Sequence, residues 1–276
     1  MYSPHFTRIR PTKRLTMLGA ALLAAVLATP AQATKLAQLQ SSGTFRLAFA
    51  TAQAPLIYKD GNGFSGFVIE LMGVLSKQMK VDKVSWKQAA SPQSLVQNLQ
   101  SSSYDAIIDS RLPKPLGGVN VSQPLACTGG VILSKPGGPE YENELKDKRI
   151  GVVTGSDYFF FVRNLSVPKK IQVYADDTQA LLGFLGGTVD VLVTDRYAAL
   201  KMLRSAGDKK LQVGPLLWSQ DLRVVMGGNL NGNVMVDSSE VLGNLNINLK
   251  KMLDDGSYAA LSKKYFSQDV RCDTQR

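Results

Sequence analysis

Two copies of one pattern decide the fold, Ser103-Tyr104-Asp105-Ala106-Ile107-Ile108-Asp109 and Thr188-Val189-Asp190-Val191-Leu192-Val193-Thr194-Asp195. In each copy an apolar, strand-like segment begins and ends near an Asp. A helix-like segment precedes each copy, at residues 91–100 and 176–185 respectively. Ligands of open α/β sheets bind beyond the carboxyl ends of the strands. The second Asp of each copy therefore predicts a cleft with an acid on either side.

The apolar periodicity around both copies predicts two similar β-α-β-α-β units. Alternating elements of this length indicate mostly parallel sheets with helices on both faces. Two further strands, at 127–134 and 222–226, and two terminal helices, at 238–253 and 257–266, complete the prediction. The expected strands of the two units are 45–49, 83–86, 104–108, 149–153, 171–174 and 189–194, and their helices are 67–79, 91–100, 158–165 and 176–185.

The first 33 residues have the pattern of a secretory signal peptide. Basic residues, an apolar run at 15–28 and the small-residue sequence Ala31-Gln32-Ala33 follow one another. The apolar run is shorter than the roughly 20 residues needed to span a bilayer. We predict cleavage after Ala33 and a mature protein in the periplasm.

Charge and histidine content exclude several functions. Cleavage removes four basic residues and no acids, which lowers the formal net charge from +10 to +6. The remaining basic residues are scattered, without a stripe of interleaved aromatics, so nucleic-acid binding is not expected. The single histidine, His5, leaves with the signal peptide. A mature chain without histidine has no Ser-His-Asp triad and no His metal ligand, and we expect no catalytic residue, metal or cofactor.

The two cysteines, Cys127 and Cys272, leave two possibilities open. Export to an oxidising compartment permits a disulfide between them. Because 145 residues separate them, the sequence alone does not show whether they pair or remain separate thiols.

Several short motifs occur in a fixed order along nearly the whole mature chain. They are Gly43-Thr44-Phe45-Arg46-Leu47, Ala54-Pro55, Phe64-Ser65-Gly66-Phe67, Tyr104-Asp105-Ala106-Ile107-Ile108, Val121-Ser122-Gln123-Pro124-Leu125, Arg149-Ile150-Gly151-Val152, Val189-Asp190-Val191-Leu192-Val193-Thr194-Asp195 and Asp254-Asp255-Gly256-Ser257-Tyr258. This order resembles the periplasmic solute-binding proteins of polar amino-acid ABC transporters, the bacterial extracellular solute-binding protein family 3.

The resemblance implies a two-lobed periplasmic-binding-protein type II fold, each lobe a mostly parallel sheet flanked by helices. Lobe 1 would comprise residues 34–124 and the helical part 224–276, and lobe 2 would comprise residues 125–223. Such proteins close by hinge motion around a small polar solute. The implied partners are that solute and an inner-membrane ABC permease, and the implied state is a monomer.

The resemblance also implies roles for residues of the second lobe. An acid at the position of Asp195 holds the α-ammonium group of the ligand, and the alternative is that Asp195 only caps the following helix. A small hydroxyl residue at the position of Ser156 contacts the ligand carboxylate. The neighbouring Asp157 would oppose an anion there, and simple capping of the helix is the alternative.

The first lobe departs from the family pattern. Asp109, Ser110 and Arg111 follow the first repeated strand, but no Arg stands where the family clamps the α-carboxylate, and neither Arg111 nor Lys114 is in register. The alternative is that Asp109 and Arg111 pair with each other. The first β-α loop completes a predicted ligand-binding set of Gln53, Leu56, Tyr58, Asp109, Ser110, Arg111, Ser156, Asp157 and Asp195.

The sequence supports three hypotheses for function. The leading one is a non-enzymatic binding protein that delivers a small polar solute, an amino acid or an amine, to an ABC transporter; the acids Asp109, Asp157 and Asp195 favour a cationic solute. The missing Arg favours an accessory or sensor protein of a periplasmic dehydrogenase system that has lost solute binding. The third hypothesis is a periplasmic dehydratase that uses carboxylates.

Overall fold

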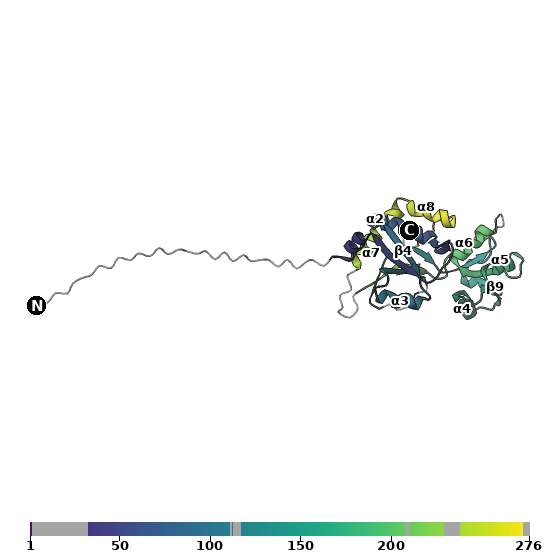
Figure 1. Cartoon of the computed structure of the whole chain (residues 1–276). Helices are drawn as coiled ribbons and strands as arrows, with labels where there is room; N and C mark the ends of the chain where they lie inside the picture. Colours follow the sequence, from purple (N-terminus) through teal and green to yellow (C-terminus); the bar gives the residue numbers. More distant parts are fainter. Residues whose placement is uncertain (2–32, 111, 113–116, 208–209, 229–237, 273–276) are drawn as a thin grey trace. The chain divides into compact units, whose positions relative to one another are not determined.

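The computed structural model describes residue 1 and residues 33–272, except 111, 113–116, 208–209 and 229–237 (Figure 1). Residues 2–32 of the predicted signal peptide therefore lie outside the described residues, as does Arg111. Within the described part of the chain, no helix is long and apolar enough to cross a membrane.

The first unit forms a five-stranded sheet that also takes in a strand from much later in the chain. Its order is β4-β1-β5-β14-β6. Strand β1 pairs in parallel with β4 and β5, whereas β14 pairs antiparallel with β5 and β6. The strands are β1 (Thr44–Phe49), β4 (Lys83–Gln88), β5 (Ala106–Ile108), β6 (Val119–Val121) and β14 (Val224–Gly227).

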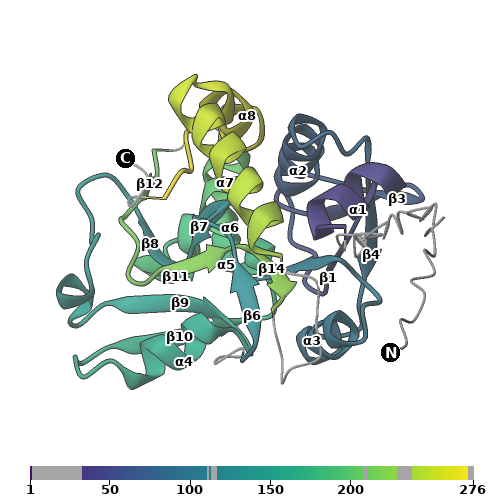
Figure 2. The same cartoon turned by 90° about the vertical axis from the view of Figure 1, so that its left-hand side faces the viewer.

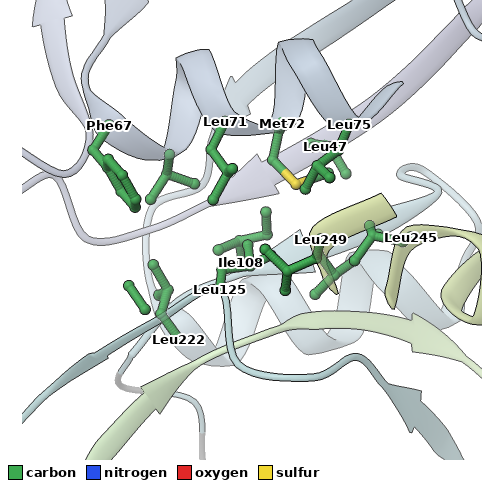
Figure 3. Packing of buried hydrophobic residues seen from close by; sticks show 14 of the residues in the cluster. Leu47, Phe67, Leu71, Met72, Leu75, Ile108, Leu125, Leu222, Leu245 and Leu249 are labelled. Atoms are coloured by element: carbon green, nitrogen blue, oxygen red, sulfur yellow. The ribbon is translucent and has the colours of Figure 1, made fainter. Parts of the chain in front are cut away.

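Helices cover both faces of this first sheet, as Figure 1 shows for α2, α3 and α7 around β4. Alternation along β1 places Leu47 and Phe49 in the larger core and Ala48 in a smaller core beneath α3. Apolar residues of α2 and α7 fill the larger core, with Leu71, Leu75 and Leu249 at most 1% exposed (Figure 3). The helices are α1 (Lys35–Ser42), α2 (Phe67–Gln78), α3 (Pro92–Gln100), α7 (Ser239–Asp254) and α8 (Ser257–Phe266).

The second unit forms its own five-stranded sheet, with the order β10-β9-β11-β8-β12. Strand β9 lies between β10 and β11 and is parallel to both, and β8 is antiparallel to β11 (Figure 2). Separate apolar clusters cover its two faces, one beneath α5 and α6 and one beneath α4. The elements are β8 (Gly130–Ser134), η1 (Glu142–Leu145), β9 (Arg149–Val153), α4 (Asp157–Asn164), β10 (Lys170–Tyr174), α5 (Asp177–Leu185), β11 (Val191–Asp195), α6 (Arg196–Ser205) and β12 (Gln212–Val213).

The predicted strands at 127–134 and 222–226 are both wrong as single strands. The second divides at Arg223 into β13 (Gln220–Leu222) and β14 (Val224–Gly227), which pair in different sheets, and the first divides at Gly129. Strand β7 (Ala126–Thr128) pairs antiparallel with β13 (Gln220–Leu222), outside both large sheets. Gly129 has φ +143°, and a side chain there would collide with the Trp218 carbonyl. A Cβ at Gly130 would collide with the Trp218 ring. The approach of Trp218 therefore requires two glycines and divides the segment.

The two sequence copies form the same ion pair, which confirms the repeat. In the first copy the Asp105 carboxylate accepts hydrogen bonds from the backbone N–H of Arg46 (2.9 Å) and from its guanidinium. In the second copy the Asp190 carboxylate accepts the same bonds from the backbone N–H (2.8 Å) and guanidinium of Arg149. Each Arg lies in the first strand of its unit, so the first Asp of each copy fixes the start of a strand to its neighbour.

Cys127 and Cys272 form a disulfide, with their Cα atoms 5.1 Å apart. Cys127 lies in β7, and Cys272 lies beyond the last helix, α8. The disulfide decides between the two possibilities that the sequence left open, and it ties the C-terminal segment to β7. A short hairpin of β2 (Tyr58–Asp60) and β3 (Gly63–Ser65) completes the fold.

Candidate functional site

A cavity of about 310 Å³ lies where several strands of both sheets end. Its walls include residues 51–53 after β1, Ser110 after β5, Val153 at the end of β9, residues 155–158 after β9 and Asp195 at the end of β11. Such carboxyl-terminal edges are where open α/β sheets bind ligands. We call it the acidic cavity, because Asp157, Asp177 and Asp195 line it and none of its described lining residues is Lys or Arg.

Asp195 has the most hydrogen bonds in the acidic cavity, and its side chain is almost fully buried. Its Oδ1 atom accepts hydrogen bonds from the backbone N–H groups of Tyr197 (2.8 Å) and Ala198 (3.2 Å). Its Oδ2 atom accepts from the hydroxyl groups of Thr128 and Tyr158. Asp195 is therefore the N-cap of α6, as the alternative proposed, and it also faces the cavity.

A fifth donor to Asp195 comes from the first sheet's side of the cavity. The side-chain amide of Gln53 donates to Asp195 Oδ1 over 2.8 Å. Gln53 follows β1, whereas Asp195 ends β11, so this bond joins segments that belong to different sheets. An amide N–H thus lies where the resemblance would place a ligand's ammonium group.

Asp109, the second Asp of the first copy, has a different environment from Asp195. Its carboxylate accepts hydrogen bonds from the backbone N–H groups of Ala50 (2.9 Å) and Thr51 (2.7 Å) and from the Thr51 hydroxyl. Asp109 therefore shapes the loop that leads to Gln53. It lines a neighbouring cavity of about 270 Å³, together with Ser110 and Arg223, and not the acidic cavity.

Ser156 and Asp157 lie at the N-terminus of α4 and line the acidic cavity. The Ser156 hydroxyl accepts a hydrogen bond from the backbone N–H of Phe159 (3.1 Å) and donates one to the Val153 carbonyl (2.6 Å). Ser156 is therefore the N-cap of α4, and its hydroxyl already has both a donor and an acceptor.

The structure places Leu56 and Tyr58 away from the acidic cavity. The chain turns back after Gln53, whose carbonyl accepts from the N–H groups of Leu56 and Ile57. Leu56 is 5% exposed and packs in the first sheet's core. Tyr58 lines a separate cavity of about 410 Å³ between α6 and α8. The turn explains why a stretch of six residues does not present all its side chains to one site.

Of the nine predicted residues, five lie together around the acidic cavity: Gln53, Ser110, Ser156, Asp157 and Asp195. The sequence reasoning missed Asp177 and Tyr158. Asp177 follows the cap residue Asp176 in the first turn of α5, a position beyond β10 at which an acid could have been noticed. Asp177 is exposed to solvent on one side, and desolvation by the surrounding protein atoms, together with the charges of Asp195 and Asp176, raises its pKa, while Lys201 opposes this effect.

Tyr158, which lines the acidic cavity, also belongs to a cluster of aromatic side chains with Trp218 and Phe161. Its ring stacks on Trp218 with centroids 5.6 Å apart, and Phe161 packs against the same indole at 4.6 Å. Tyr158 and Phe161 lie three residues apart on α4, so one face of the helix meets Trp218. The stack fixes the Tyr158 hydroxyl, which donates to Asp195 over 3.1 Å.

Comparison with known families identifies the chain. Residues 45–268 match the model of the bacterial extracellular solute-binding proteins, family 3. The chain belongs to this family. Its fold is thus the two-lobed type II fold, with a mostly parallel sheet flanked by helices in each lobe, and the fold class predicted from the sequence is confirmed.

Named relatives are binding proteins. The lysine/arginine/ornithine-binding periplasmic protein of Escherichia coli K12 is 28% identical over 236 residues, which cover 82% of this chain and 89% of the relative. The L-cystine-binding protein TcyJ of the same strain is 24% identical over 247 residues, 84% of this chain and 86% of the relative.

Solved structures share the fold at lower identity. A polar amino-acid ABC uptake transporter substrate-binding protein from Streptococcus thermophilus superposes with a TM-score of 0.72 at 22% identity, covering 86% of this chain and 91% of its own. An ancestral cyclohexadienyl dehydratase superposes with a TM-score of 0.61 at 23% identity, covering 86% and 98%. The fold is therefore common to binding proteins and to an enzyme.

Proposed function

We propose that this protein captures a small cationic solute, a basic amino acid or another amine, in the acidic cavity and delivers it to an ABC transporter. The observation that carries the proposal is the composition of the cavity wall, which has three carboxylates and no Lys or Arg among its described residues. Hydrogen bonds between a charged ammonium group and a carboxylate are roughly twice as strong as neutral ones. A cavity of this charge therefore favours a cation over an anion.

The proposal includes a hinged arrangement of the two lobes. Lobe 1 would comprise residues 34–124 and 224–276, and lobe 2 residues 125–223. The chain passes from one sheet to the other through β7 and returns through β13, and these two crossings pair with each other. We propose this pair as the hinge, the predicted signal peptide at 1–33 as the export signal, and the periplasm as the place of action.

Asp195 would bind the solute's ammonium group in this proposal, and Asp157 and Asp177 would favour a second positive charge. The relative named for lysine, arginine and ornithine supports a solute of this class. Ser156 gives little support for a carboxylate contact, because backbone groups already occupy its hydroxyl. The amine would therefore contribute more to recognition than an α-carboxylate.

Isothermal titration tests the proposal. The protein is first freed of co-purified solute by unfolding, dialysis and refolding, and is then titrated with lysine, arginine, putrescine, cystine, glutamate and succinate. We expect binding of the cationic solutes and no binding of the dicarboxylates. Binding restricted to glutamate or succinate would refute a cationic ligand.

One observation favours the accessory hypothesis as a second candidate. Asp195 accepts hydrogen bonds from five donors among the described residues, so protein groups already occupy the carboxylate that would bind an ammonium group in this family. A protein that has lost solute binding would give no heat with any solute in the titration. Turnover of a carboxylic acid, followed by chromatography, would instead support the dehydratase hypothesis.

A further inference from the structure

We propose that Gln53 is an intramolecular competitor for Asp195, which a solute must displace and which only a charged ammonium group displaces well. The inference rests on the proposed function and adds to it a residue that determines specificity. Its basis is the 2.8 Å hydrogen bond from Gln53 Nε2 to Asp195 Oδ1. This bond joins the two sides of the acidic cavity, because both residues line it.

Among the five donors to Asp195 in the described part of the chain, Gln53 is the one that can leave without disrupting its own element. Two of the other donors are backbone N–H groups fixed in the first turn of α6. The third is the hydroxyl of buried Thr128 in β7. The fourth is the Tyr158 hydroxyl, whose ring the stack on Trp218 holds in place. The Gln53 side chain is half-buried and reaches Asp195 from the loop after β1.

The backbone on both sides of Gln53 is fixed, so rotation of its side chain alone can release Asp195. On one side, Asp109 binds the N–H groups of Ala50 and Thr51. On the other, the N–H of Gln53 donates to the Ile57 carbonyl over 2.8 Å, and the Gln53 carbonyl accepts the N–H of Ile57. The loop thus presents the Gln53 amide from a fixed backbone position on the first sheet's side of the cavity.

Because the Gln53 amide already binds the Asp195 carboxylate, a solute must form a stronger hydrogen bond with Asp195 than this neutral amide does. An amide or hydroxyl of a neutral solute would only exchange one neutral donor for another, with no net gain in hydrogen bonding. An ammonium group would replace a neutral donor by a charged one, which is the stronger partner for a carboxylate. Displacement would also remove a contact between the two sides of the cavity, so a bound solute must itself bridge them.

The test compares wild-type protein with Gln53→Met, which keeps the side-chain length and removes the amide. The matched control is Gln88→Met, because the exposed Gln88 amide also contacts this loop, at the Ala50 carbonyl (3.1 Å), but does not line the cavity. The Kd for lysine and putrescine is measured by isothermal titration. We expect Gln53→Met to bind about tenfold more tightly, the scale of one hydrogen bond to a charged group, and Gln88→Met to match wild type. We also expect uncharged solutes that carry an amide or hydroxyl but no ammonium group, such as acetamide and glycerol, to bind detectably only to Gln53→Met.

A second measurement uses protein without solute. Spin labels at Gln78→Cys on α2 and Leu182→Cys on α5 report the distance between the two sheets by pulsed dipolar spectroscopy, under non-reducing conditions that keep the native disulfide. We expect a longer or broader distance distribution in Gln53→Met than in wild type and Gln88→Met.

The possible outcomes distinguish failure of the competitor role of Gln53 from failure of the proposed function. Amine binding that is equal or weaker in Gln53→Met overturns the competitor role and leaves the proposed function standing. An unchanged distance distribution in Gln53→Met also overturns the inference, because the bond would then not join the two sides of the free protein. Absence of amine binding in every variant refutes the proposed function, and the competitor role falls with it.

Discussion

The side-chain amide of Gln53 donates a hydrogen bond to the carboxylate of Asp195 over 2.8 Å, although 142 residues separate them in the chain. The second Asp of the other copy, Asp109, binds the N–H groups of Ala50 and Thr51 and so holds the loop that carries Gln53. The two repeated acids therefore meet at one loop in unequal roles. Asp109 fixes the backbone of the loop, and Asp195 accepts a hydrogen bond from the Gln53 side chain that the loop carries.

The substitution Asp195→Asn should weaken cation binding strongly and keep the fold. Asn caps helices about as well as Asp, so α6 keeps its N-cap, but the negative charge is lost. We expect the affinity for lysine to fall at least tenfold, and the unfolding free energy to fall by about 1–3 kcal/mol, because an amide nitrogen in place of Oδ2 cannot accept from Thr128 and Tyr158. Titration calorimetry and urea unfolding measure the two effects.

The control for this substitution is Asp176→Asn. Asp176 is also an N-cap, accepting from the Gln179 N–H (2.8 Å), but it does not line the acidic cavity. Equal losses of lysine affinity in both variants would show that capping, and not the charge at Asp195, matters for binding.

The sequence predicted the two sheets well because the repeated pattern is satisfied by contacts within its own α/β unit. Each copy carries its own Arg–Asp pair between neighbouring strands, so the pattern specifies the same pairing twice. Periodicity also located the helices that it predicted to within a few residues, whereas α1 (Lys35–Ser42) was not predicted. The prediction of one strand at 127–134 failed because its division depends on Trp218, about 90 residues away, although the adjacent glycines Gly129 and Gly130 were a local sign of it.

The residues around the acidic cavity were predictable where they stand at the ends of strands and not elsewhere. Asp195 and Asp157 follow strands of the second sheet, and the rule for α/β sheets places them together. Leu56 and Tyr58 follow a turn whose direction is set by hydrogen bonds to Gln53, which the sequence does not show. The disulfide was open for a similar reason, since the approach of Cys127 and Cys272 depends on the tertiary fold.

Removing the buried carboxylate of the first Arg–Asp pair should weaken the protein in a pH-dependent way. Burial alone would raise the pKa of Asp105, but hydrogen bonds from Arg46 and Lys35 outweigh burial and lower it below its ordinary value near 3.8. The stabilisation is therefore complete above the unfolded-state pKa and is lost as pH falls through the folded-state pKa. We expect Asp105→Asn to lower the unfolding free energy at pH 7 by about 1–3 kcal/mol.

Urea unfolding between pH 3 and pH 7 measures this prediction. The difference between wild type and Asp105→Asn should shrink toward the acid end of the series. Asp190→Asn is the matched variant, because it removes the same pair in the second copy, where the Asp side chain is 35% exposed against 4% for Asp105. A larger loss in Asp190→Asn than in Asp105→Asn would contradict the dependence on burial.

The disulfide should contribute strongly to stability, because it closes a loop between residues 145 apart in sequence. Removing a native disulfide from a secreted protein typically costs about 2–5 kcal/mol. We expect the double substitution Cys127→Ser and Cys272→Ser to lower the unfolding free energy within this range, and dithiothreitol to change the stability of wild type alone. Two thiols titrated in denatured, unreduced wild-type protein would disprove the bond.

Solute binding at Asp195 should change the fluorescence of Trp218 and not that of Trp86. Trp218 stacks on Tyr158, whose hydroxyl donates to Asp195, so a new partner at that carboxylate alters the ring beside the indole. Trp86 lies in β4 at the edge of the first sheet, packed against Phe49. We expect Trp86→Phe to keep the fluorescence change on addition of lysine and Trp218→Phe to lose it while titration calorimetry still detects binding. Persistence of the signal in Trp218→Phe would place the bound solute away from the Tyr158 side of the cavity, because the chain contains only these two tryptophans.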